Sequence, residues 1–200
     1  MIGQQQKDQA EKWFKDLRDK ICEEFEILEE DHLKLAPKSD VAAKKFERKS
    51  TIRETDDKED GGGGVMATLK GGRIFEKVGV NVSAVYGNLA PEAQKSITAR
   101  KAIPELKDDP RFWASGISLV AHMRNPHTPA IHLNTRMFWT PHAWWFGGGT
   151  DLNPSIENDD DTNFFHQTLK KKCDKHNQSY YKKFKDWADE YFFIPHRKVA

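Results

Sequence analysis

The sequence has few cysteines, no long apolar run and almost no net charge. Its two cysteines, Cys22 and Cys173, lack the short spacing of a zinc site or a redox pair, which is typical of reduced thiols in an intracellular protein. No apolar run approaches the ~18 residues that a membrane helix needs. Met1 is not followed by a basic patch and an apolar core, so no signal peptide is expected. These absences predict a cytoplasmic protein.

The charge balance argues against a nucleic-acid-binding module. The net charge is +1 although 32% of the residues are charged, so no strong field would attract a polyanion. A chain of 200 residues can bury a core, and a single domain over 1–200 is expected. Because charge gathers in the first third, we expect a helix and charged segment at 1–60 and a sheet with the active-site core at 61–200.

Two alternating segments in the middle of the chain predict a β-hairpin. Apolar and polar residues alternate over 117–124 and 131–138, and Asn-Pro-His-Thr-Pro at 125–129 supplies the turn. One face would carry Ile117, Leu119, Ala121 and Met123 with Ile131, Leu133, Thr135 and Met137. The other would carry Ser118, Val120, His122 and Arg124 with His132, Asn134 and Arg136. This second face suits an anionic ligand that needs a proton donor, or it is the hydrated face of a sheet.

The remaining patterns predict an α+β fold. Apolar spacing indicates helices at 5–34, 160–176 and 178–191, with a short helix at 91–100. Strands are expected at 65–70, 74–86 and 143–146. The glycine run 61–64 is expected to be a flexible turn into the sheet, and 147–149 a plain turn or a ligand-contacting loop. The first helix would bury Trp13, Phe14, Leu17, Ile21, Phe25 and Leu28, and the last would turn Tyr180, Phe184, Trp187 and Tyr191 inward. The expected architecture is a large, mainly antiparallel β-sheet flanked by helices on both sides.

Several long motifs follow one another between Gly61 and Arg197. They are GGRIFEKVGVNVS at 71–83, SLVAHMRNP at 118–126, HLNTR at 132–136, WWFGGGTDL at 144–152, His166, and WADEYFFIPHR at 187–197. In this order they resemble the oxygen-dependent coproporphyrinogen III oxidase family. Met123, Asn153 and Ser155 depart from the family's usual residues, and none of them removes a polar site residue. The family chain is longer, so we expect this one to be C-terminally truncated. The part beyond Ala200 would carry further substrate contacts, an acidic residue implicated in catalysis and the dimerising helix.

The resemblance implies an oxidative decarboxylase of haem and porphyrin biosynthesis. The family converts coproporphyrinogen III to protoporphyrinogen IX: two propionates become vinyl groups, carbon dioxide leaves, and molecular oxygen is the oxidant. It needs no organic cofactor, and its members are homodimers. The partner expected for this chain is therefore a small tetrapyrrole that carries four carboxylates.

The same resemblance implies a set of site residues. His132 matches the position of a proton donor, a task that suits an imidazole because it titrates near working pH. Arg136 is the strongest candidate for a substrate carboxylate, since a guanidinium offers a bidentate fork. The rest of the expected binding set is Ser118, Arg124 and the backbone groups of Asn134 and Thr135.

Four histidines match positions proposed as metal ligands in some bacterial members of the family. They are His122, His132, His166 and His196. Imidazole is a good ligand for borderline divalent ions, but no pair here has a compact ligand spacing. The alternative is that these histidines hydrogen-bond substrate carboxylates and each other, so a divalent metal is an open expectation.

Two other functions are compatible with the residues. A tetrapyrrole-binding protein without turnover, or an inactive fragment of the oxidase, would bind the substrate and form no product. A metal-dependent hydrolase built on the histidines would need a stoichiometric metal and no oxygen. Product analysis with and without oxygen and chelator separates these functions from the oxidase.

Overall fold

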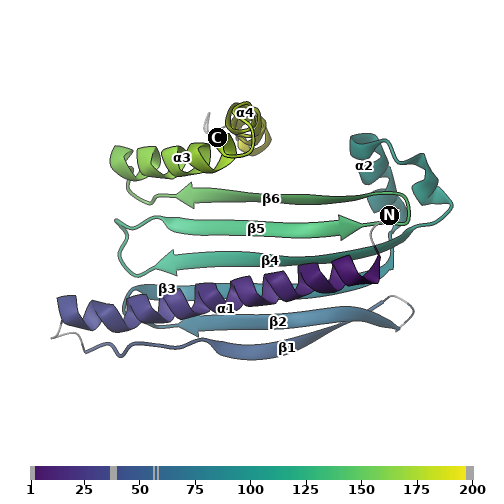
Figure 1. Cartoon of the computed structure of the whole chain (residues 1–200). Coiled ribbons are helices and arrows are strands. Elements are labelled where there is room, and N and C mark those ends of the chain that lie inside the picture. The colour runs from purple at the N-terminus through teal and green to yellow at the C-terminus, as the bar shows by residue number, and fades with distance from the viewer. Residues whose placement is uncertain (1–2, 37–39, 56, 58, 197–200) are drawn as a thin grey trace. The chain divides into compact units, whose positions relative to one another are not determined.

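The computed structural model describes residues 3–36, 40–55, 57 and 59–196 (Figure 1). Arg197, the last residue of the family-like motifs, lies outside the described residues. The chain divides into two compact units, Met1–Ser155 and Ile156–Ala200, and each is described by itself. In the described part of the chain, no helix is both long and apolar enough to cross a membrane.

The first unit is built on a six-stranded antiparallel sheet. In chain order the strands are β1 Glu47–Glu54, β2 Asp60–Lys70, β3 Phe75–Asn88, β4 Arg111–Met123, β5 Ala130–Trp139 and β6 Trp144–Asn153. Each strand pairs with its neighbours in the sequence, so the order across the sheet is β1-β2-β3-β4-β5-β6. A helix, α2 Pro91–Lys101, and a 3-10 turn, η1 Pro104–Lys107, connect β3 to β4. The predicted α+β class and antiparallel sheet are confirmed.

The long helix α1, Gln4–Leu35, packs against β3 and β4 and runs roughly along the direction of the strands (Figure 1). Phe14 is fully buried there, and Ile117 and Leu119 of β4 lie beneath the helix in the same core, whereas Ser118 and His122 are exposed. Burial of one such side chain contributes about 1.5–3 kcal/mol. The predicted alternation in this strand is confirmed.

The predicted core face of α1 is wrong in two places. Trp13 is 55% exposed and Leu28 is 47% exposed, whereas Arg18, Cys22 and Glu29 are buried like Phe14. The physical reason is that the buried stripe runs from Phe14 in steps of four residues to Cys22 and then of seven to Glu29, whose carboxylate bonds to the backbone of the first unit. Burial also raises the pKa of the Cys22 thiol to about 11, which keeps it protonated and inert at neutral pH.

Glu29 fastens the far end of α1 to the turn between β2 and β3. Its carboxylate is fully buried and accepts hydrogen bonds from four backbone N–H groups, those of Lys44, Arg73, Ile74 and Phe75, at 2.7–3.3 Å. A Cβ at Gly72 would lie 2.4 Å from the carboxylate, so the turn needs glycine at that position. Satisfied donors of this kind make a buried carboxylate tolerable.

Replacing Glu29 by alanine should lower the free energy of unfolding by about 3–5 kcal/mol, because the donors in the turn lose their charged acceptor. Glu29→Gln should cost less but still more than about 1 kcal/mol, since its amide nitrogen cannot accept from the donors it meets. Urea denaturation followed by tryptophan fluorescence measures both. The control is Glu30→Ala, an exposed neighbour whose loose ion pair with Lys45 is worth under about 0.5 kcal/mol. Equal small losses for the Glu29 and Glu30 variants would contradict this role.

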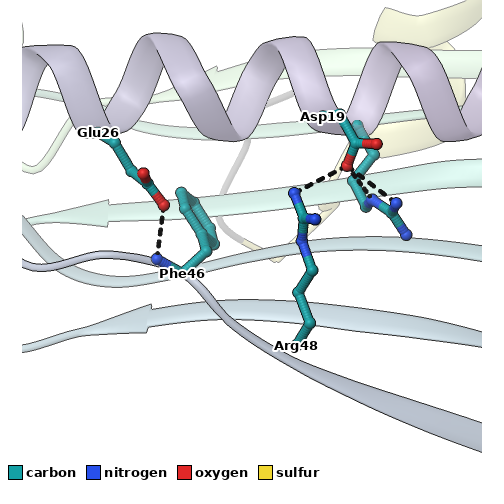
Figure 2. A network of polar contacts seen from close by, with 5 residues as sticks. Asp19, Glu26, Phe46 and Arg48 are labelled. Carbon is teal, nitrogen blue, oxygen red and sulfur yellow. Dashed lines mark hydrogen bonds and ion pairs between the residues drawn. The ribbon is translucent and has the colours of Figure 1, made fainter.

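The first strand, β1, was not predicted from the sequence. Its one large apolar residue, Ile52, is 84% exposed, so no buried face marks the segment as a strand. It is held by pairing with β2 and by acidic groups of α1: Asp19 binds Arg48 at 2.8 Å, and Glu26 accepts from the backbone N–H of Phe46 at 2.8 Å (Figure 2). A strand held by such contacts leaves no hydrophobic signal.

The expectation of turns at both glycine runs is wrong, because the two runs lie inside strands. Gly61–Gly64 belong to β2, and Gly147–Gly149 belong to β6. A Cβ at Gly63 would lie 2.2 Å from the carbonyl oxygen of Thr51 on the neighbouring strand, and one at Gly148 would lie 2.3 Å from that of Asn134. Glycine therefore serves close approach between strands rather than chain reversal.

Other local predictions meet a mixed outcome. The turn at 125–129 is confirmed, with the Thr128 N–H donating to the Asn125 carbonyl at 3.0 Å. The helix predicted from Pro91 is confirmed as α2. In a regular strand Phe75 and Lys77 would share a face, but a bulge between them turns Phe75 into the core, where it is 2% exposed.

The second unit contains two helices, α3 Asp159–Asp174 and α4 Tyr180–Phe192, close to the predicted ranges. The Asn158 side chain caps α3 by accepting from the N–H groups of Asp160 and Asp161. The expected inward aromatic face of α4 is wrong, because its members, Tyr180, Phe184, Trp187 and Tyr191, are 40–61% exposed. Their rings contact one another in pairs along the helix instead, Tyr180 with Phe184 and Trp187 with Tyr191. His196, one of the candidate metal ligands, lies in an exposed turn.

Candidate functional site

Strand register brings most of the predicted site residues onto one face of the sheet. Ser118 of β4 lies directly opposite Asn134 of β5, and the neighbouring pairs are Val120 with His132 and Gly116 with Arg136. This is the face opposite α1, which we call the distal face. Thr135 is the exception, because alternation turns its side chain to the α1 side with the buried Met137. Asn134 and Thr135 also lie in a strand that is paired on both sides, so the sheet already uses their backbone groups.

His132 is held by a carboxylate on the next strand. Its Nδ1 lies 2.7 Å from Oδ1 of Asp151, and the two side chains are about equally exposed, at 36% and 39%. An ionised carboxylate only accepts, so Nδ1 carries the proton in this pair and Nε2 is the ring nitrogen left for a ligand. The Asn153 amide bonds to the same carboxylate. The ring of His122 packs edge-on against His132, with centroids 5.9 Å apart.

Arg136 is an exposed cation on the same face. In the part of the chain that the structure describes, it makes no hydrogen bond or ion pair, so its guanidinium is available to a ligand. A Cβ at Gly116 would lie 2.6 Å from Cβ of Arg136, which means that this glycine makes room for the arginine. Along β5, Arg136 and His132 are four residues apart, or about 13 Å at the usual rise of a strand. Arg124, by contrast, lies in the exposed turn beyond β4.

Glycine and aromatic residues make the middle of the distal face flat. Gly79, Gly147 and Gly149 present no side chain there, and a Cβ at Gly149 would meet no atom within 4 Å. At the end beyond Arg136, Phe138 stacks between Phe112 and Trp145, with centroids 5.7 and 4.9 Å away. A flat surface with an aromatic end, a cation and a histidine–carboxylate pair suits a planar or saucer-shaped acid.

The structure brings together two of the four candidate metal-binding histidines. His122 and His132 are neighbours on the distal face, whereas His166 and His196 belong to the second unit. His166 bonds through Nδ1 to the Tyr181 hydroxyl at 3.1 Å. Over the described residues, no three groups of the kinds that bind metals converge. The quartet therefore stays a prediction.

Sequence reasoning missed Asp151 and Asn153 as partners of His132. The acidic residue for catalysis was expected beyond Ala200, yet a carboxylate already lies at the histidine. The signal was present: if alternation is continued through Gly147 and Gly149, the next residues in phase are Asp151 and Asn153. Treating the glycines as a turn ended the strand too early and hid this phase.

Comparisons with known proteins identify relatives over most of the chain. The family model described as coproporphyrinogen III oxidase matches residues 9–200. The oxygen-dependent coproporphyrinogen-III oxidase of Rickettsia peacockii (strain Rustic) is 45% identical over 192 residues, covering 96% of this chain and 63% of that protein. The enzyme of the same name from Rickettsia bellii (strain RML369-C) is 42% identical over 197 residues, covering 98% and 65%. The chain thus spans a little under two thirds of the length of these relatives.

Proposed function

Because the chain belongs to the coproporphyrinogen III oxidase family, we propose that it carries out the oxygen-dependent oxidative decarboxylation of coproporphyrinogen III to protoporphyrinogen IX. The observation that supports this most is the distal face, where Arg136, without a partner among the described residues, and a histidine–carboxylate pair flank a flat, glycine-lined surface. The oxidase names of the relatives support oxygen as the co-substrate.

The chemistry defines what the residues must do. Each propionate plus one proton and one dioxygen gives a vinyl group, carbon dioxide and hydrogen peroxide, so the side chain loses its carboxyl carbon and two electrons pass to oxygen. The step consumes a proton. His132 would supply it from its ring, while Asp151 stabilises the imidazolium through Nδ1.

Substrate orientation would come from the polar groups beside this pair. Arg136 would bind one carboxylate of the macrocycle through its fork, with Ser118 and Asn134 donating next to it. About 13 Å separates Arg136 from His132 along the strand, so a macrocycle anchored at one edge can present its opposite edge to the histidine. The stacked rings around Phe138 would take an apolar edge of the substrate.

Cofactor, assembly and location stay predictions. Catalysis without an organic cofactor agrees with a reduced, electron-rich macrocycle that itself reacts with oxygen. If a divalent ion is required, His122 and His132 are the ligands that already lie together, and the ion would act on the substrate as a Lewis acid. The homodimer is proposed for the full-length protein of this family, and a cytoplasmic location with 1–200 as one domain completes the proposal.

The test is product analysis on the 200-residue chain. We expect protoporphyrinogen IX, carbon dioxide and hydrogen peroxide from coproporphyrinogen III in air, and none under nitrogen. Pretreatment with a chelator decides the metal question. The Rickettsia bellii enzyme serves as the full-length comparison. Tight substrate binding without any oxygen-dependent product would replace this proposal by the alternative of a tetrapyrrole-binding protein.

A further inference from the structure

A hollow lies on the side of the sheet opposite the distal face, between α1 and strands β2–β4. Its volume is about 330 Å³. Its floor consists of Gly63, Ala84 and Ser115, which are direct neighbours across three strands. Because these side chains are the smallest in the sheet, they leave space where larger ones would fill the gap beneath the helix. The apolar Val65 and Val82 border this floor.

The roof of the hollow is polar, which is unusual for the inner side of a helix. Glu11, Lys15 and Arg18 of α1, at spacings of four and three residues, all line it. Arg18 is 8% exposed and bonds to Asp19 through Nε and Nη2, and Asp19 also takes a bond from Arg48. Lys15 lies 3.5 Å from Glu11 in a loose pair near the opening. Three cations, Lys15, Arg18 and Arg48, thus accompany two carboxylates, those of Glu11 and Asp19. The surplus of one positive charge favours a ligand with a single negative charge.

Ser115 at the floor lacks a partner. It is 2% exposed, and its Oγ makes no hydrogen bond to any residue that the structure describes. Of the other two hydroxyl-bearing residues that line the hollow, Tyr86 already donates to Asp60 and Ser83 is exposed. A buried hydroxyl without a partner is costly, so Ser115 indicates a ligand atom that accepts its proton.

We propose that this hollow binds a short-chain monocarboxylate. Its carboxylate would accept from the Ser115 hydroxyl, from the free N–H groups of Arg18 and from Lys15, while its alkyl chain would contact Val65 and Val82. Glu11 and Asp19 would exclude a dianion by repulsion. The site lies on the opposite face of the sheet from Arg136 and His132, so it is independent of the proposed oxidase chemistry.

Calorimetric titration of the purified chain with butyrate tests the proposal without any turnover assay. We expect saturable binding with a Kd in the millimolar range, matched by a rise in Tm that saturates at the same concentrations. Sulfate and butanol should give neither effect. Ser115→Ala and Lys15→Met should each weaken butyrate binding about tenfold or more. Ser115→Val, which also fills the floor, should abolish it.

The matched control is Lys12→Met, which removes an exposed cation from another face of α1, where it pairs with Asp16. Its affinity for butyrate should equal that of the unchanged chain. Butyrate binding that is equal in all variants, or no saturable binding in the unchanged chain, would overturn the site and leave a hollow that holds water alone. Circular dichroism of each variant shows whether the fold is kept. If the Ser115 variants fail to fold, Lys15→Met, a substitution on the helix surface, still tests the site.

Discussion

Replacing His132 by asparagine should lower kcat for coproporphyrinogen oxidation by about 10²–10⁴-fold, the usual contribution of a positioned proton donor. The KM should change by less than about threefold, because the asparagine keeps the size of the side chain and the binding groups on β4 and β5 remain. Asp151→Asn should lower kcat by a smaller factor, about tenfold, since it weakens the group that stabilises the imidazolium without removing the ring. Steady-state kinetics under air measures kcat and KM for both variants and for the unchanged chain.

The control for His132 is another histidine of the same hairpin. His127 lies in the exposed turn between β4 and β5 and bonds to Asn125 through its backbone N–H. His127→Asn should leave kcat within about twofold, in line with other exposed substitutions far from a site. If His132→Asn keeps more than a tenth of the original kcat, the proton-donor role is lost and the pair with Asp151 is structural.

Replacing Arg136 by alanine should act on binding rather than on the chemical step. We expect kcat/KM to fall about 10²–10³-fold, mainly through KM, because the guanidinium binds the same carboxylate in the substrate and in the transition state. Arg136→Lys should recover part of this loss, since an ammonium keeps the charge but not the fork. Coproporphyrin III, the oxidised and stable macrocycle, gives a second measurement by quenching of tryptophan fluorescence, with Kd raised in parallel.

Two further arginines, Arg111 and Arg124, serve as comparisons for the Arg136→Ala result. Arg111, at the start of β4, is engaged with Asp109 at 2.6 Å, and Arg111→Ala should leave kcat/KM unchanged within about twofold. Arg124 belonged to the predicted binding set but lies in an exposed turn, so its removal should cost less than that of Arg136. Unchanged kcat/KM in Arg136→Ala would remove this residue from the site.

The alternating segments were predictable because two physical constraints coincide in them. From 117 to 123, every second side chain must fit beneath α1, so apolar and polar residues follow the period of the strand. The faces of Ser118, His132 and Arg136 could therefore be assigned from the sequence alone. Their alignment across strands also follows, since a short turn at 125–129 fixes the register of the hairpin.

The features that the sequence did not predict are those without a periodic hydrophobic pattern. Strand β1 is held by charged contacts to α1, and the glycine runs of β2 and β6 are strands because backbones approach closely there. Neither feature changes the hydrophobic pattern of its own segment. Glu29 is a similar case: as one of many acidic residues on a charged helix, it gives no sign that it is fully buried against a turn more than forty residues later.

The order of the sheet also has a consequence for folding kinetics. Each strand pairs with the one next to it in the chain, and four of the five connections are short loops that cost little closure entropy; the longer connection, from β3 to β4, carries α2 and η1. The docking of α1 on β3 and β4 is the contact that joins distant parts of the chain. Such a topology keeps the contact order of the sheet low and places the slow, non-local step at the helix. The face that carries Ser118, His132 and Arg136 comes from one continuous stretch, 111–153, and can acquire its register before the helix arrives.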